Sequence, residues 1–180
     1  VIDHHCSPSF IEGSLTLLAE TGKRLGIATG LAFEVTDRNG PELFEKSLQE
    51  NLDAAEKHSE DLELAALLGL HASFTLGEDS LKKVAEVLSR REEWGIHTHL
   101  SEDRADEEDS IKRGYGSAVQ RLDHYGLINA SSMLIHGVHC LASDADRILR
   151  HGAKLVHNPS SNANNRIGML QGSAAGELKP

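Results

Sequence analysis

Short apolar, β-branched runs alternate along the chain with longer segments of helical period. Six of these runs are predicted to be strands: Val1–His5, Ile27–Val35, Leu67–His71, Gly95–Leu100, Met133–His139 and Lys154–His157. Each run is short enough for a strand that is buried on both faces, and strands that alternate with helices are typical of repeated βα units in a parallel sheet. The pattern therefore predicts an α/β protein built from about six βα units.

The segments between these strands carry signals for helix starts. Pro41 suits the first position of a helix whose apolar residues recur at helical spacing, at Phe44, Leu48, Leu52 and Ala55. Further helix caps are predicted at Asp79, at Ser117 with Gln120, and at Ser143 with Asp146. The charged stretch 101–116 is predicted to be a loop, either over an active site or simply solvated. A domain over residues 1–167 is expected to be followed by a loop or disordered tail over 168–180.

Composition argues against several kinds of partner. With 18 Lys and Arg against 28 Asp and Glu, the net charge is -10, and neither nucleic acid nor a membrane is an expected partner, because nucleic acids and anionic membranes are bound through clustered cations. Only Cys6 and Cys140 are present and no CxxC pair occurs, so no disulfide framework is predicted and the reducing cytoplasm is the expected location. No apolar run approaches the roughly 18 residues of a membrane span.

Histidines are abundant, and most of them fall where predicted strands end. The polar residues at or just beyond the carboxyl ends of the strands are His4, His5, Glu34, His71, His97, His99, His136, His139 and His157. In a parallel βα barrel these ends converge on the face that carries the active site. Any one such histidine is more often a hydrogen-bonded structural residue, but imidazoles and carboxylates that converge from several strands can bind a divalent metal.

The strongest local motif is GIHTHLSE over residues 95–102. His97 and His99 are two apart on a predicted strand, so their side chains point to the same side of the sheet. Glu102 lies on the loop directly after the strand. A neutral imidazole can ligate a metal, and a nearby carboxylate can carry the proton of a metal-activated water. The motif therefore predicts metal-dependent hydrolytic chemistry.

Three motifs in order, HTHLSED, LIHGVHC and VHNPSSN, resemble those of the amidohydrolase superfamily, and more narrowly its cytosine-deaminase and chlorohydrolase branch. The segments VIDHHCSPSF and EVTDRNG also look like a subgroup of aminohydrolases linked with selenium metabolism. The resemblance spans residues 1 to about 167. It implies a (β/α) TIM barrel and an enzyme in which metal-activated water displaces an amine or halide from a small cyclic, nitrogen-containing substrate.

The resemblance also implies roles for individual residues. His99 matches the metal ligand at the end of the fifth barrel strand, and Glu102 matches the catalytic glutamate that shuttles the proton. His136 matches a sixth-strand histidine that either takes part in catalysis, by orienting water and substrate, or ligates a second metal.

The cofactor implied by the resemblance is one divalent ion, zinc before iron, nickel or manganese, with a second metal less expected. The residues expected to shape the pocket for a small-molecule substrate are His71, His139, His157, Asn158, Ser160 and Asn162. For Asn158 and Asn162, capping a helix or anchoring a loop is an equally good interpretation.

Two elements of the family pattern are missing from the sequence, an HxH pair on the first barrel strand and an Asp on the eighth. His4 and His5 belong to the second strand by their VIDHH context, and Asp144 and Asp146 lie at a predicted helix cap. The six strands would then be barrel strands 2–7, and the chain is expected to be an incomplete barrel, a fragment with two open strand edges. Open edges favour a homo-oligomer or pairing with the missing barrel segments.

Other interpretations compete with this one. A non-catalytic remnant could bind metal or a partner without turnover, and whether the 180 residues alone are active is left open. Hydrolysis of amide rings or phosphoesters is disfavoured because no strand-end Lys is available to be carbamylated and bridge two metals. A doubly wound nucleotide-binding domain is disfavoured because no glycine-rich phosphate loop follows a predicted strand.

Overall fold

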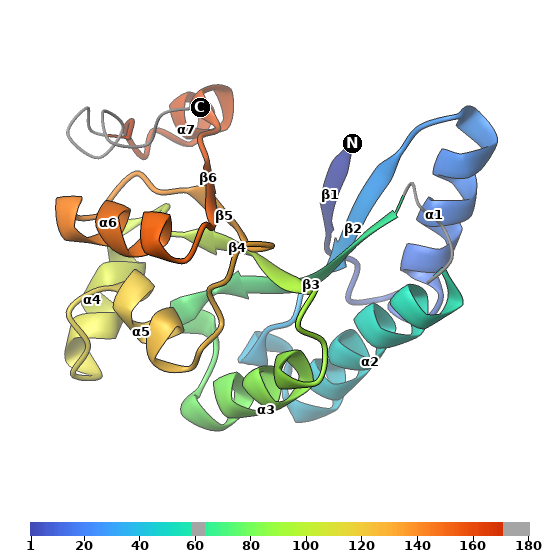
Figure 1. The fold of residues 1–180 in the computed structure, drawn as a ribbon, viewed down its shortest axis with the longest axis horizontal. Helices are drawn as coiled ribbons and strands as arrows, with labels where there is room; N and C mark the ends of the chain where they lie inside the picture. Colours follow the sequence, from blue (N-terminus) through green and yellow to red (C-terminus); the bar gives the residue numbers. More distant parts are fainter. Residues whose placement is uncertain (59–63, 171–180) are drawn as a thin grey trace.

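The computed structural model describes residues 1–58 and 64–170, which form a sheet of six parallel strands flanked by helices (Figure 1). The strands are β1 (Ile2–His5), β2 (Thr29–Phe33), β3 (Leu64–Ala72), β4 (Gly95–Leu100), β5 (Met133–His136) and β6 (Lys154–Val156). The helices are α1 (Ser14–Leu25), α2 (Pro41–Lys57), α3 (Glu78–Ser89), α4 (Arg104–Lys112), α5 (Ala118–His124), α6 (Ala142–Arg150) and α7 (Pro159–Asn165), with short 3-10 turns η1 (Asp37–Asn39) and η2 (Ser73–Thr75).

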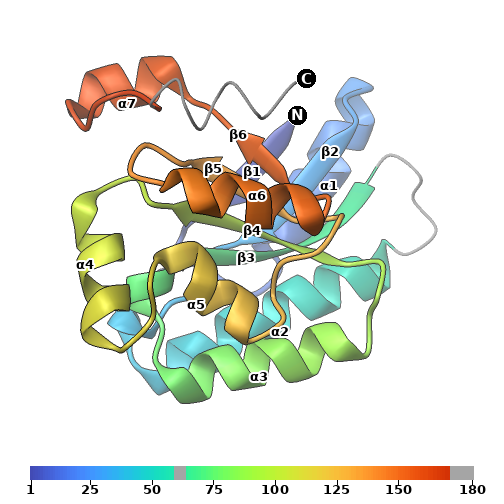
Figure 2. The same ribbon diagram turned by 60° about the vertical axis from the view of Figure 1, so that its left-hand side comes forward.

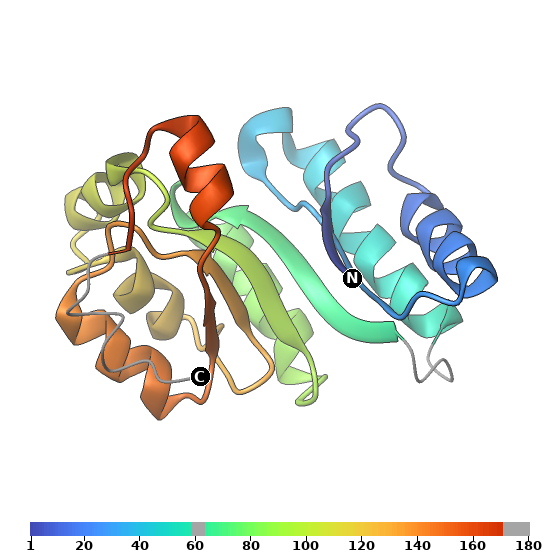
Figure 3. The same ribbon diagram turned by 90° about the horizontal axis from the view of Figure 1, so that it is seen from above.

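Each strand pairs in parallel with the next one along the chain, in the order β1 to β6. All carboxyl ends therefore lie along one edge, where His5 is in register with Phe33 and Leu100 with His136. Among the described residues β1 and β6 each pair with a single strand, and they lie at the two ends of an open arc (Figure 3). The predicted parallel α/β class is confirmed.

The main hydrophobic core lies between the sheet and the helices packed against it (Figure 2). In α3, Leu81, Val84 and Leu88 share one buried face because residues three and four apart lie above one another on a helix. This face packs in the same core as residues of the strands, among them Leu68 and Ile96. The helix layer thus covers one face of the sheet, and the side chains on the opposite face are left to line a site.

A buried asparagine of α2 joins β2 to β3 where the two strands separate. Asn51 is 2% exposed, and its Oδ1 accepts the N–H groups of Phe33 (2.9 Å) and Gly69 (3.3 Å). Its Nδ2 donates to the carbonyl oxygens of Phe33 (3.0 Å) and Ser47 (2.8 Å). One side chain therefore satisfies backbone groups that no strand partner reaches.

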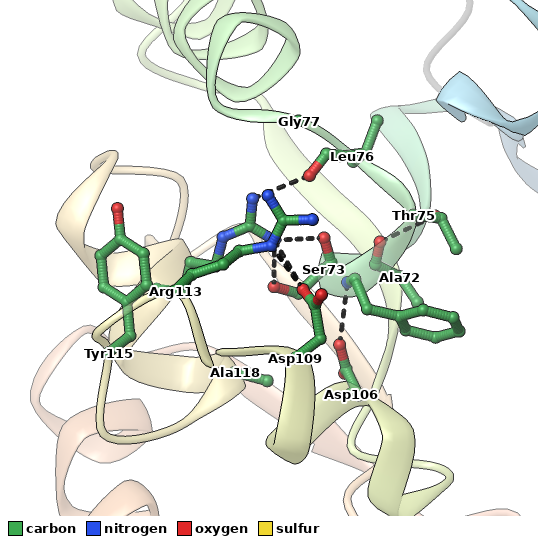
Figure 4. A network of polar contacts seen from close by, with 12 residues as sticks. Ala72, Ser73, Thr75, Leu76, Gly77, Asp106, Asp109, Arg113, Tyr115 and Ala118 are labelled. Atoms are coloured by element: carbon green, nitrogen blue, oxygen red, sulfur yellow. Dashed lines mark hydrogen bonds and ion pairs between the residues drawn. The ribbon is translucent and has the colours of Figure 1, made fainter. Parts of the chain in front are cut away.

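A buried arginine of α5 holds the turn after β3. Arg121 has no exposed surface, and its guanidinium donates to the carbonyl oxygens of Ser73 (2.5 Å) and Leu76 (2.7 Å) and to Glu78 Oε1 (3.2 Å). Ser73, in η2, and Leu76, just after it, lie at the centre of this network (Figure 4). The fork geometry of arginine suits several acceptors at once, so the turn that follows His71 has a fixed backbone.

The predicted elements agree with the structure best where the pattern is most regular. β4 has the predicted bounds, α2 begins at Pro41 as predicted, and Ser117 Oγ accepts the Gln120 N–H at 3.1 Å as its cap pattern predicts. Several other strands are shorter than predicted, since β5 ends at His136 and β6 at Val156.

Three predictions about helices were wrong, beginning with the loop expected over 101–116. Its residues 104–112 form α4, which Asp103 caps by accepting the Ala105 N–H. Apolar residues in this helix do not recur at helical spacing. The sequence signal for the helix was instead its acidic first turn and basic last turn, which suit the helix dipole.

The two other errors concern caps. α3 begins at Glu78 after Gly77, so Asp79 is not its cap and instead pairs with Lys82. α6 begins at Ala142, so Ser143 is not its cap. The Asp144 carboxylate accepts the Leu141 N–H (3.0 Å) at the start of α6, so a carboxylate takes the place of the predicted hydroxyl.

Two helices, α1 and α7, were not predicted, and α7 contains half of the predicted pocket motif VHNPSSN. The tail predicted over 168–180 falls mostly outside the described residues, and its described part, 168–170, contains neither helix nor strand. None of the helices in the described part of the chain is long and apolar enough to cross a membrane.

Replacement of Asn51 by Leu should lower the free energy of unfolding by about 3 kcal/mol, because the Phe33 N–H and carbonyl would stay buried without partners. Gln49→Leu is the matched control, since Gln49 is an exposed amide on the same helix, and it should change the stability by less than about 0.5 kcal/mol. Urea unfolding of both variants measures the difference. Equal stabilities would show that Asn51 does not hold the two strands together.

Candidate active site

Five histidines from four strands gather where the strands end, and we call them the histidine cluster: His4, His71, His97, His99 and His136. The ring of His99 is central. Its centroid lies 4.6 Å from that of His4, 5.4 Å from that of His71 and 5.7 Å from that of His136. The alternation of side chains along β4 puts His97 and His99 on the same side of the sheet, as the motif predicted. Parallel pairing then brings the neighbouring strand ends to the same place.

The tautomer of His99 follows from its hydrogen bond. Its Nδ1 lies 2.7 Å from the carbonyl oxygen of His71. A carbonyl can only accept, so Nδ1 carries the proton and Nε2 keeps its lone pair. A ring nitrogen held in this way is the usual state of a metal-ligating histidine.

His136 is held in the same way by a side chain of α7. Its Nδ1 lies 2.7 Å from Asn162 Oδ1, and the other amide atom, Asn162 Nδ2, lies 3.5 Å from Nδ1 of His157. With the amide so oriented, Nδ1 of His136 is the donor and Nε2 is free to accept or to ligate. His136 has φ +80°, a left-handed conformation that is rare outside glycine. Asn162 has no exposed surface.

The tautomer of His71 is fixed through a hydroxyl that the sequence motifs did not single out. Thr75 Oγ1 donates its one proton to the carbonyl of Ala72 (2.9 Å) and lies 3.1 Å from Nδ1 of His71. Since the hydroxyl proton is already used, Nδ1 of His71 must be the donor. Three histidines of the cluster therefore carry the proton on Nδ1.

His4 and His97 form a buried pair in the cluster. Their Nδ1 atoms lie 2.8 Å apart, so one ring donates and the other accepts. His4 Nε2 is buried without a hydrogen-bond partner among the described residues, 3.8 Å from Glu34 Oε2. Both residues were predicted to lie at strand ends, and His97 was predicted as part of the metal-binding motif GIHTHLSE, whereas no individual role was predicted for His4.

Burial lowers the pKa of three histidines of the cluster, His4, His97 and His71. Burial, and after it the neighbouring histidines, lowers the pKa of His4 to about 2. Burial lowers the pKa of His97 to about 4, with His99 adding to the effect. Burial also lowers the pKa of His71 to about 4, against the opposing charge of Glu34. Neutral imidazole is the form that ligates a metal.

Glu102 faces the cluster from the loop after β4. Its Oε1 lies 3.7 Å from Nε2 of His136 and accepts from Asn165 Nδ2 at 3.3 Å. The carboxylate is 30% exposed, so it can exchange protons with solvent. This brings together the predicted trio of His99, Glu102 and His136.

Two cavities adjoin the trio. The larger, about 610 Å³, is lined by His4, His97, His99, His136, Asn158 and Ser161, together with the apolar side chains of Val1, Ile2, Met133, Ile135 and Val156. The smaller, about 90 Å³, lies beside Glu102 and is lined also by His71, His99, Phe74 and Asp106. The larger volume is in the range of small-molecule pockets.

The remaining predicted pocket residues lie at different depths. Asn158 lines the larger cavity, but Ser160 is exposed and its neighbour Ser161 lines the cavity instead, because α7 turns successive residues to different faces. His157 is half-buried next to Asn162. His139 lies in the turn after β5, outside both cavities, and its N–H donates to the Ser101 carbonyl (2.9 Å).

The donors present fit a divalent metal in kind but fall short in number. Imidazole Nε2 atoms and a carboxylate are suitable zinc ligands, and a catalytic zinc takes three protein ligands as a rule. Over residues 1–58 and 64–170, no group of three or more His, Cys, Asp or Glu side chains has the arrangement of a complete metal site. His99 and His136 can therefore supply part of a ligand set.

The chain resembles known deaminases in sequence. It is 31% identical over 157 residues to a 5-methylthioadenosine/S-adenosylhomocysteine deaminase of Thermococcus kodakarensis, covering 85% of this chain and 36% of that protein. It is 27% identical over 147 residues to a 5'-deoxyadenosine deaminase of Methanobrevibacter smithii, covering 81% and 34%. The chain thus spans about a third of the length of the curated relatives it matches.

Solved structures share the fold at low sequence identity. A zinc-bound adenosine deaminase of Xanthomonas campestris aligns with a TM-score of 0.81 and 16% identity, over 96% of this chain and 39% of that one. Guanine deaminase of E. coli aligns with a TM-score of 0.80 and 18% identity, over 98% and 43%. The described strands therefore form part of a TIM-type barrel, as predicted. The profile of the amidohydrolase family matches residues 2–173, and the chain belongs to this family.

Proposed function

We propose that the protein containing this chain is a metal-dependent hydrolase that removes an amine from a small nitrogen heterocycle. One observation carries the proposal: His99 and His136, each with Nδ1 engaged in a hydrogen bond, line the larger cavity, and the Glu102 carboxylate lies 3.7 Å from Nε2 of His136. The names of the sequence relatives, deaminases of adenosine-type compounds, support an amine as the leaving group. Because the chain spans a third of those relatives, the activity is proposed for the whole protein.

Zinc is the proposed metal, supported by the zinc-bound adenosine deaminase of the same fold. It would supply Lewis-acid activation of water at neutral pH. We propose His99 as a ligand and His136 as a candidate second ligand, with the remaining ligands from outside the described residues. The carbonyl of His71 and the amide of Asn162 would hold the two rings in the ligating orientation.

Glu102 is the proposed catalytic acid and base. It would take a proton from the attacking water and return it to the leaving amine, which requires a carboxylate within reach of both. In the Nδ1–H tautomer that the hydrogen bond to Asn162 selects, Nε2 of His136 accepts rather than donates a hydrogen bond. That tautomer favours a role for His136 in orienting water or ligating metal over direct donation to the substrate.

The substrate is proposed to occupy the larger cavity. Its apolar wall, Met133, Ile135 and Val156, suits the faces of a heterocycle, and Asn158 offers an amide to a ring nitrogen or amino group. Further proposed contacts are His71, His139, His157 and Ser160, whereas Asn162 is proposed to act through His136. The cytoplasm is the proposed location, supported by the free thiols of Cys6 and Cys140.

The edges of β1 and β6 are the proposed attachment points for the rest of the barrel. Each has an unpaired side among the described residues, and unpaired parallel strands bind further strands. The missing strands would come from the same polypeptide or from a second copy.

Glu102→Gln in the full-length protein should lower kcat by about 10²–10⁴-fold, because an amide cannot carry the proton. The zinc content should stay unchanged. Ammonia release from a panel of amino-heterocycles, adenosine derivatives first, measures turnover, and elemental analysis measures zinc. Glu108→Gln, an exposed carboxylate of α4, is the control and should remain fully active.

Two results would contradict the proposal. Turnover retained by Glu102→Gln would remove the carboxylate from the mechanism. No ammonia from any substrate with the zinc-loaded wild-type protein would leave halide displacement or a non-catalytic metal-binding role.

The tautomers give a separate test that needs no substrate. In metal-free protein at neutral pH, long-range ¹H–¹⁵N spectra should show His99 and His136 protonated on Nδ1. Asn162→Leu should remove this preference at His136 and leave His99 unchanged, and it should weaken zinc binding by about 10–100-fold. Protonation of His136 on Nε2 in the wild-type protein would refute the assigned orientation.

A further inference from the structure

The residue before Glu102 has an unfavourable backbone conformation. Ser101 has φ +48° and no exposed surface. A non-glycine residue is held in this left-handed region only where its surroundings over-determine it. Because Ser101 immediately precedes Glu102, the groups that hold Ser101 also set the direction in which the Glu102 side chain leaves the backbone.

Every polar group of Ser101 is bonded. Its N–H donates to Asp106 Oδ2 (2.9 Å), and its hydroxyl donates to Glu107 Oε1. Its carbonyl accepts the His139 N–H (2.9 Å), and its Oγ lies 3.5 Å from Cys140 Sγ. Two carboxylates from the first turn of α4 therefore hold the backbone and the hydroxyl of this one residue.

Asp106 joins this loop to the turn that follows β3. Its second oxygen, Oδ1, accepts the Phe74 N–H at 3.0 Å. The carboxylate of Asp106 points to the Ser73–Thr75 turn (Figure 4), and the buried Arg121 donates to the Ser73 carbonyl of the same turn. Thr75 of the same turn fixes His71. One carboxylate thus connects the loop of Glu102 with the turn of His71.

Asp106 is buried at a cost, and what it gains there is two backbone hydrogen bonds, from Ser101 and Phe74. The side chain is 2% exposed and has no ion pair with a Lys or Arg among the described residues. Burial raises the pKa of this carboxyl to about 6, although the N–H groups of Ser101 and Phe74 oppose the shift. A buried carboxylate without a directly paired cation is unfavourable, and the two amides that it satisfies belong to the segments that follow His99 and His71.

Helix capping does not explain Asp106 either. Asp103 is the N-cap of α4 and accepts the Ala105 N–H. Asp106, at the third position, bonds no amide of its own helix and instead reaches Ser101 and Phe74. It also lines the 90 Å³ cavity together with Glu102, His71 and His99. Asp106 therefore fixes the backbone of two segments, at Ser101 and Phe74, that border the cavity beside Glu102.

We propose that Asp106 is a positioning residue, whose carboxylate holds the β4 loop and the β3 turn together so that Glu102 stays within reach of His99 and His136. The proposal rests on the proposed function of Glu102. Asp106 itself touches neither the substrate nor the metal in this proposal, and its effect passes through the backbone of Ser101.

The test compares Asp106→Asn with Glu108→Gln in the full-length, zinc-loaded protein. Asparagine has one oxygen, so its amino group would face one of the two N–H groups. We expect kcat to fall about 10–100-fold, with KM and zinc content within about twofold of the wild-type values. We also expect the Ser101 amide to exchange with solvent at least about tenfold faster. Glu108→Gln should change none of these.

A double-mutant cycle separates positioning from general damage. If Asp106 acts through Glu102, adding Asp106→Asn to Glu102→Gln should lower the remaining activity by less than about twofold. A further tenfold loss in that background would overturn the proposal. An unchanged kcat in Asp106→Asn, or a kcat loss that follows zinc content or KM, would also overturn it.

Ser101→Gly covers the case in which Asp106→Asn does not fold. Glycine adopts φ +48° without strain, so this variant should fold. Because glycine keeps the N–H that Asp106 accepts, Asp106→Asn is repeated in the Ser101→Gly background, where it should lower kcat at least about fivefold at unchanged KM. Equal kcat in Ser101→Gly and in Ser101→Gly/Asp106→Asn would refute the proposal. Failure of the wild-type protein to turn over any substrate would instead refute the proposed function, which separates the two.

Discussion

The site depends on the parallel pairing of six strands in chain order. Parallel strands place all their carboxyl ends at one edge, so residues far apart in the sequence meet there without any direct attraction between them. His4 and His97, 93 residues apart, are brought to 2.8 Å in this way. Burial lowers the pKa values of His4, His71 and His97, so the backbone ladder and the helix layer bear the cost of gathering these rings. A different order of parallel strands would leave the same residues at this edge but farther apart along it.

A second layer of polar groups decides what these imidazoles can do. The carbonyl of His71, the hydroxyl of Thr75 and the amide oxygen of Asn162 each accept a hydrogen bond from an Nδ1 atom. The groups that orient His99 and His136 lie on other segments of the fold, and the hydroxyl that orients His71 lies in the turn after its own strand. The direction of the free lone pairs is therefore a property of the packed fold, and the choice of residues in the HTH motif alone does not determine it.

The sequence predicted the strands and the strand-end residues because both depend on local patterns. Gly95–Leu100 was predicted with its observed bounds, and the parity of His97 and His99 follows from strand geometry alone. The hydrogen bond between His136 and Asn162 joins residues 26 apart in the sequence, and that between Phe33 and Asn51 joins residues 18 apart. No local sequence pattern predicts contacts between residues so far apart. The helix α4 was not predicted because the prediction of helices relied on the spacing of apolar residues. This helix is stabilised by an N-cap, by charges that suit the helix dipole and by buried carboxylates.

Strained backbone is concentrated where β4 and β5 end. Among the described residues, Ser101, His136 and Arg166 are the non-glycine residues with positive φ, and the first two lie just after β4 and at the end of the adjacent β5. Ser101 directly precedes Glu102, and His136 belongs to the trio. Asp106 and Glu107 bond Ser101, and Asn162 bonds the ring of His136. Strain of about 1–3 kcal/mol at each position is offset by these buried bonds. The buried acids of α4 are thus best understood through the loop geometry that they enforce.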